Sequence, residues 1–153
     1  MSKSVMTRSV DSITAESLKF RKVIRCLAKK WRVASLVDTT VEWSHRLSRS
    51  PGLAFPERML VRLNVRLREP CYSSILHEAL CHELAHLAVY AMHGRDAPMH
   101  GLEWRRLVEE AGYEARMGIH IPELVSSDSS SVRYEHFCPR CHAKRFAKRR
   151  QTR

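Results

Sequence analysis

The stretch that decides how the chain is interpreted runs from Ser73 to Gly94 and reads SSILHEALCHELAHLAVYAMHG. Its apolar residues recur at helical spacing, at positions 75, 76, 80, 84, 87, 88 and 91. Serine is a common N-cap, and glycine commonly follows the last turn of a helix. We therefore predict one long helix, capped by Ser73 or Ser74 and ending at His93-Gly94.

The middle of this helix carries the pattern His82-Glu83-Leu84-Ala85-His86. Residues four apart lie on the same helix face, so both imidazoles can bind one metal ion at about 2.0–2.1 Å. Glu83 lies about 100° further round the helix, where its carboxylate can take a proton from metal-bound water. The pattern predicts a zinc site with Glu83 as the catalytic general base. The alternative is a pair of histidines on a solvated or hydrogen-bonded helix face.

A catalytic zinc site has three protein ligands and one open position. His77 lies on a different side of the helix from His82, and His93 lies too far along the axis. His100 follows a glycine-containing turn and a proline, so the chain has room to fold back there. Gly101 also allows a close approach of the backbone. We prefer His100 as the third ligand over the other candidates, His77, His93 and His120.

The segments on either side predict an α+β fold. A helix is expected from about Thr14 to Trp31, followed by strand alternation over residues 41–46 and 59–67. Residues 48–52 form a turn between these strands, and we expect a small antiparallel sheet. A further helix is predicted over residues 101–112.

These motifs resemble the SprT-like zinc metallopeptidases, a group that includes the Spartan proteases that degrade proteins crosslinked to DNA. The resemblance covers roughly residues 14–141 and rests on the segments His82–His86, Gly94-Arg95, Ala97-Pro98, His100-Gly101, Glu103-Trp104, Val41–Ser44 and Arg62–Asn64. One departure is Met99, which makes the spacing before the third ligand one residue longer than in some members.

The resemblance implies a zincin-like minimal core with an N-terminal helix, a small sheet, a metal-binding helix and a third-ligand helix. It implies His82, His86 and His100 as zinc ligands and Glu83 as the catalytic acid-base. It also implies that Trp104 packs under the third ligand, and that a small zinc ribbon follows the core.

The tail holds one pair of that ribbon, Cys138 and Cys141. Two thiolates are half of a tetrahedral zinc site. Three interpretations stay open: the chain stops before a second pair, His136 or His142 completes a second zinc site, or the cysteines are free. The charged residues from position 140 onward are all basic, and we predict nucleic-acid contacts from Arg140, Lys144, Arg145, Lys148, Arg149 and Arg150.

Composition points to an acidic partner. The chain has 27 Lys and Arg against 16 Asp and Glu, a net charge of +11. Nucleic acid, and DNA in particular, is the expected acidic partner, ahead of an anionic membrane surface or an acidic protein. No apolar run approaches the roughly 20 residues that span a bilayer, so no membrane partner is expected.

Five cysteines at irregular spacing favour reduced thiols and a cytoplasmic location, nucleoid-associated in a prokaryote. Cys26, Cys71 and Cys81 are interpreted as packing residues.

We expect a flexible leader over residues 1–13, a metallopeptidase core over 14–125, a serine-rich linker over 126–133, and a partial zinc-ribbon knuckle with a basic tail over 134–153. The predicted function is a zinc-dependent endopeptidase acting on DNA-associated or DNA-crosslinked proteins, as in crosslink repair. The main alternative is a non-catalytic DNA-binding or adaptor module with a structural zinc site. A zinc hydrolase acting on small amides is a third hypothesis.

Overall fold

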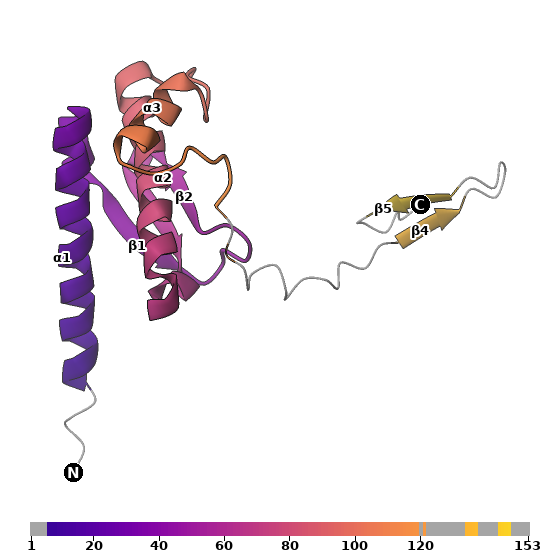
Figure 1. Cartoon of the computed structure of the whole chain (residues 1–153). Coiled ribbons are helices and arrows are strands. Elements are labelled where there is room, and N and C mark those ends of the chain that lie inside the picture. Colours follow the sequence, from indigo (N-terminus) through magenta and orange to yellow (C-terminus); the bar gives the residue numbers. More distant parts are fainter. Residues whose placement is uncertain (1–5, 120, 122–133, 138–143, 148–153) are drawn as a thin grey trace, which may run out of the picture. The chain divides into compact units, whose positions relative to one another are not determined.

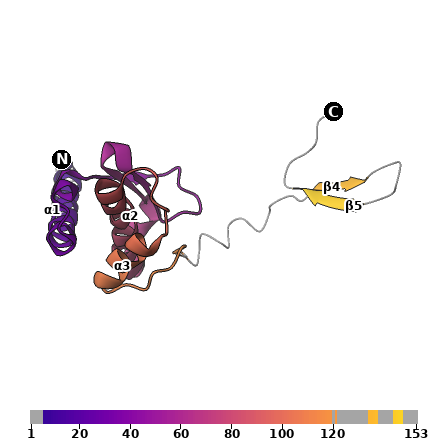
Figure 2. The ribbon, with the colours of Figure 1, turned by 90° about the horizontal axis from the view of Figure 1, so that it is seen from above.

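The computed structural model describes residues 6–119, 121, 134–137 and 144–147. The chain divides into two compact units, residues 1–120 and residues 121–153. In the first unit, three helices accompany a three-stranded sheet (Figures 1 and 2). The fold class is therefore α+β, as the sequence predicts.

Helix α1 spans Met6–Trp31. It begins eight residues before the predicted start at Thr14, so the second part of the expected leader lies within a helix. Its buried residues are Phe20, Ile24, Leu27, Ala28 and Trp31. Leu18 is exposed, although it is apolar. The Trp31 indole donates a hydrogen bond of 3.0 Å to the backbone oxygen of Leu107, which ties this helix to the C-terminal part of the unit.

The sheet has the order β1-β3-β2, with strands β1 Thr40–Ser44, β2 Gly52–Phe55 and β3 Leu60–Asn64. Strands β1 and β3 are parallel, and β2 and β3 are antiparallel. The sheet is therefore mixed, and the prediction of an antiparallel sheet is wrong for one of its two pairings. The central strand, β3, is the most buried of the three, and residues of both its faces are covered.

Asn64 explains why the predicted strand over residues 59–67 stops early. Its side-chain oxygen accepts a hydrogen bond of 3.1 Å from the Arg66 backbone N–H. This local bond competes with the strand ladder, and a short 3-10 helix follows over Val65–Arg68. The Asn64 amide, in turn, donates to the backbone oxygens of Leu47 and Ser50, at 2.6 and 3.2 Å. It thereby holds the loop that leads into β2.

Helix α2 spans Ser73–His93, and Gly94 ends it with a φ of 80°. The predicted end is confirmed. The predicted serine cap is wrong, because the N-cap is Tyr72 and no side chain caps the helix. A 3-10 turn over Pro70–Tyr72 leads into α2 and takes the place of such a cap. Helix α3 follows at Leu102–Glu110, close to the predicted range.

The second unit contains a hairpin of β4, Tyr134–Phe137, and β5, Lys144–Ala147, paired antiparallel. Lys144 and Arg145 lie in β5. The other predicted tail residues, Arg140, Lys148, Arg149, Arg150 and the cysteines Cys138 and Cys141, lie outside the described residues, as does the serine-rich linker. Within the described part of the chain, no helix is both long enough and apolar enough to cross a membrane.

Candidate metal centre

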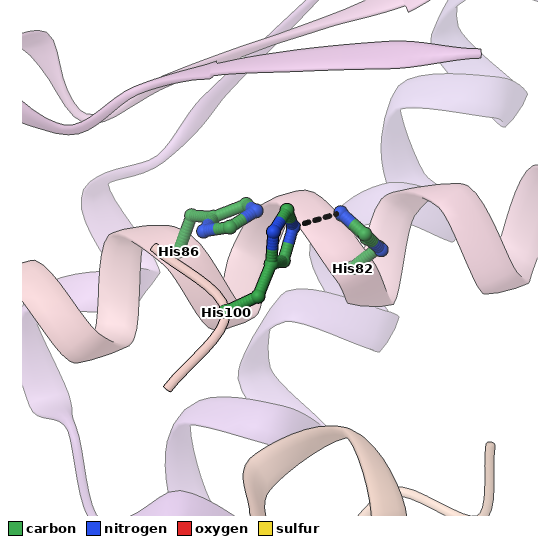
Figure 3. A group of neighbouring side chains, drawn as sticks. All are labelled: His82, His86 and His100. Atoms are coloured by element: carbon green, nitrogen blue, oxygen red, sulfur yellow. Dashed lines mark hydrogen bonds between the residues drawn. The ribbon is translucent and has the colours of Figure 1, made fainter. Parts of the chain in front are cut away.

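Three histidines converge in the first unit (Figure 3). His82 and His86 project from one face of α2, and His100 comes from the loop between α2 and α3. One ligand nitrogen from each lies within 4.8 Å of the others. The structure thus brings together the three residues that the sequence predicts as zinc ligands.

The loop before His100 folds back in two steps. Gly94 adopts a positive φ, which glycine tolerates without steric cost, and this ends α2. The Gly101 N–H then donates a hydrogen bond of 3.1 Å to the Pro98 oxygen, which forms a tight turn around His100. A Cβ on Gly101 would lie 3.2 Å from the Pro98 Cβ, so the turn is close to its packing limit. The predicted chain reversal at this loop is confirmed.

The spacing of the imidazole nitrogens fits a zinc ion. Two nitrogen ligands of a tetrahedral zinc site, with bonds of about 2.0–2.1 Å, lie about 3.3–3.4 Å apart. The Nε2 atoms of His82 and His100 lie 3.3 Å apart (dashed line in Figure 3). Three imidazoles also leave a fourth position open, as in catalytic zinc sites. The donor set and the His82–His100 spacing are therefore compatible with zinc.

Burial keeps the histidines in the form that binds metal. Burial and, to a smaller extent, the neighbouring His100 lower the pKa of His82 to about 4. Burial likewise lowers the pKa of His86 to about 4, with smaller contributions from His82 and His100. The pKa of His100 is also lowered by burial. The three imidazoles are therefore neutral at pH 7, and a neutral imidazole nitrogen can bind a cation without first losing a proton.

Trp104 on α3 forms the base of the histidine group. Its side chain is 1% exposed, and its ring lies 4.6 Å from the His100 ring and 4.7 Å from the His82 ring, centroid to centroid. It also stacks on His86 at 5.7 Å. The indole N–H donates a hydrogen bond of 3.3 Å to the His82 backbone oxygen. Trp104 therefore restricts the orientation of all three imidazoles, in agreement with the packing role that the resemblance implies.

Glu83 turns toward β2 rather than toward solvent. Burial raises the pKa of its carboxyl to about 7, while a hydrogen bond with the Ala54 backbone opposes this rise. A Cβ on Gly52 would lie 2.7 Å from the Glu83 Cγ, so this close approach requires glycine. Sequence reasoning missed both Gly52 and Ala54. The only signal was a glycine after Ser50-Pro51, which we interpreted as part of a turn.

Two cavities meet at Glu83. The larger, about 500 Å³, includes all three histidines in its lining, and the smaller, about 280 Å³, lies against Gly52 and His82. Gly52, His82 and Glu83 line both. Glu83 and one of the three histidines therefore lie where the two cavities adjoin.

The other histidine candidates lie elsewhere. His77 is exposed, and its Nδ1 donates a hydrogen bond of 2.7 Å to the Ser73 backbone oxygen. His93 is exposed at the end of α2. His120 lies outside the described residues.

The cysteines of the first unit take no part in this centre. Cys81 is buried, which raises the pKa of its thiol to about 12 and agrees with a packing role. Cys26 and Cys71 are exposed, so their interpretation as packing residues is wrong.

Comparisons with known proteins give one family match and several related proteins. The family model described as the SprT-like family matches residues 21–124. A protein named Protein SprT from Pectobacterium carotovorum subsp. carotovorum (strain PC1) is 39% identical over 93 residues, which cover 57% of this chain and 54% of that protein. Protein SprT from Enterobacter sp. (strain 638) is 33% identical over 125 residues, which cover 78% and 72%.

The chain spans just over half the length of the first of these relatives, 54% for Pectobacterium carotovorum and 57% for Pectobacterium atrosepticum. No solved structure gives a significant match. The family match and the group of three histidines together support metal binding by a metallopeptidase-like protein.

Proposed function

Because the chain belongs to the SprT-like family, we propose that it is a zinc-dependent endopeptidase. The observation that carries the proposal is the convergence of three neutral imidazoles beside a buried carboxylate, at the junction of two cavities. His82, His86 and His100 would hold the ion. A structural zinc site has no need of such a carboxylate or of an open cavity, which argues against the adaptor alternative.

Each residue of the centre has a role in hydrolysis. A zinc ion held by the three histidines would act as a Lewis acid and would lower the pKa of water toward neutrality. Glu83 accepts a proton from the water as the water oxygen bonds to the peptide carbonyl carbon. It then donates that proton to the amide nitrogen, whose bond to carbon breaks. A carboxyl with a pKa of about 7 can perform both transfers near neutral pH.

The substrate class follows from the form of the cleft. β2 is an edge strand of its sheet and borders the larger cavity. An extended peptide can pair with such an edge through backbone hydrogen bonds that do not depend on sequence. This supports protein substrates over small amides.

We also propose that the substrates are proteins held on DNA. The net charge of +11 and a row of exposed cations on α1 support this: Lys19, Arg21, Lys22, Arg25, Lys29 and Lys30. Such a face attracts phosphates without reading sequence. The basic tail would add to it, and a cytoplasmic, nucleoid-associated location belongs to the same proposal.

The test compares wild type with Glu83→Gln in casein cleavage, with and without single-stranded DNA. Glu78→Gln is the matched control, because it makes the same change on the same helix away from the cavities. We expect Glu83→Gln to retain zinc and to lose activity by about 10²-fold or more, with Glu78→Gln near wild type. Equal cleavage by wild type and Glu83→Gln would overturn the proposal, and zinc binding without cleavage would favour the adaptor alternative.

A further inference from the structure

The larger cavity extends beyond the metal centre along α2. After His86, the next residues of α2 that line it are Val89 and Tyr90. They lie three and four positions further on, about 4.5–6 Å along the helix axis. The cavity therefore has a metal-binding end and a second end whose floor has no metal ligand.

The second end is largely apolar. Phe55 and Pro56 form the wall at the end of β2, and Pro98 and Met99 form the wall on the loop that carries His100. Val89 is 4% exposed beneath them, while Met99 is 72% exposed at the rim. An open apolar surface of this kind lowers its free energy when an apolar group covers it.

The charged side chains at this end largely neutralise one another. Arg95 and Glu57 form an ion pair that joins the two walls. Apart from this pair and Glu83, Arg58 is the one further Asp, Glu, Lys or Arg among the described residues of the lining. Little net charge is left to select a charged substrate group. Arg58, which is exposed, is the residue of this lining that could attract an acidic group.

A peptide at the metal centre can reach this surface. Consecutive Cα atoms lie about 3.8 Å apart, so the side chain of the residue next to the cleaved bond can reach the second end. We propose that this end is a specificity subsite that selects a large apolar side chain, such as Leu, Met or Phe, adjacent to the cleaved bond. Phe55, Val89, Tyr90 and Met99 are its specificity-determining residues. This inference rests on the proposed peptidase function.

Binding tests the subsite separately from catalysis. The probes are fluorescent nonapeptides of Gly and Ser with one central Leu, Glu or Lys, titrated by fluorescence polarisation into full-length Glu83→Gln protein. We expect the Leu probe to bind about tenfold or more tightly than the other two. Tyr90→Asp, in the same background, should abolish the preference. Met92→Asp is the control, because Met92 is 43% exposed on the same helix and does not line the cavity.

Equal binding of the three probes would overturn the subsite, and so would tighter binding of the Glu probe, which would assign the selection to Arg58. An unchanged Leu preference in Tyr90→Asp would also overturn it. Cleavage of the same probes by wild type then separates the two proposals. Cleavage without a preference rejects the subsite and leaves the peptidase function standing. If the Leu probe binds more tightly but wild type cleaves none of the probes, the peptidase function is rejected and the subsite stands.

Discussion

At the scale of single residues, the candidate centre depends on close contacts. The imidazoles are neutral because they are buried against one another and against Trp104. Glu83 is held between the helix and the sheet because Gly52 has no side chain. Altering these contacts, by substitution or by a change in pH, should therefore change the activity or the stability of the protein.

Gly52→Ala should displace Glu83 without removing the histidine group. The added Cβ would lie 2.7 Å from the Glu83 Cγ, so the carboxylate must move. A displacement of about 1 Å at a reacting group can cost about 10²-fold in rate. We expect a loss of this order in kcat, with zinc content unchanged. Steady-state kinetics and metal analysis measure the two quantities.

A double variant identifies the route of this effect. If Gly52 acts through Glu83, Gly52→Ala should cause little further loss of activity in the Glu83→Gln background. Independent, multiplicative losses would contradict that interpretation.

The metal-free protein should become less stable as the pH falls from about 6.5 toward about 4. His82 and His86 have folded pKa values of about 4 against an ordinary 6.5, so the unfolded chain binds more protons across this range. Glu83, raised from 4.5 to about 7, acts in the opposite direction, but it is one group against two. Denaturant titrations at several pH values measure the free energy of unfolding.

Glu83→Gln removes the opposing contribution, so the decline in stability below pH 6.5 should become steeper in this variant. Metal-free stability that stays constant or rises as the pH falls would contradict the burial of neutral histidines.

At the scale of elements, the main features of α2 follow from its sequence, while β2 and the sheet pairing do not. Helical periodicity and Gly94 predict where α2 ends, and the spacing of His82 and His86 predicts a shared face. β2 has four residues and no clear alternation, and its place beside Glu83 depends on contacts remote in sequence. The parallel pairing of β1 likewise depends on which strand is buried, which strand alternation does not reveal.

Asn64 should be the residue on which the loop before β2 depends most. It is 1% exposed, and its amide donates to the backbone oxygens of Leu47 and Ser50. Asn64→Ala would leave these oxygens without that donor, and we expect a loss of about 1–3 kcal/mol in the free energy of unfolding.

Asn64→Asp should be at least as damaging, because it keeps the shape but places oxygen where two carbonyl oxygens need a donor. Chemical denaturation of both variants tests this. A loss within the error of the measurement in both would contradict the role of this side chain.

At the scale of the whole molecule, charge is the property that composition predicts most directly. The excess of basic residues lies partly on α1, whose exposed cations face solvent in the structure. Composition alone does not place these residues, because helical periodicity only indicates which of them share a face. Residues 138–143 and 148–153, which carry most of the predicted basic tail, lie outside the described part of the chain.

Arg25 and Lys29 should contribute to binding of single-stranded DNA. They lie four residues apart on α1 and are both exposed. Each phosphate contact contributes about 0.7 to the slope of log affinity against log salt for a single strand. The double change to Gln should therefore lower this slope by up to about 1.4, as measured by fluorescence anisotropy. The control is Arg62→Gln, since Arg62 is paired with Glu42 on the sheet. An unchanged slope in the double variant would remove α1 from the DNA-binding surface.

The measurement that tests the central claim most directly is the zinc content of the full chain with Cys138 and Cys141 changed to Ser, which excludes a second site in the tail. We predict about one zinc per chain, from three imidazoles and an open position. His100→Ala should lose most of this zinc, and His93→Ala, a histidine outside the group, should retain it. Zinc content that is zero in the parent protein, or unaffected by His100→Ala, would contradict the assignment of this centre.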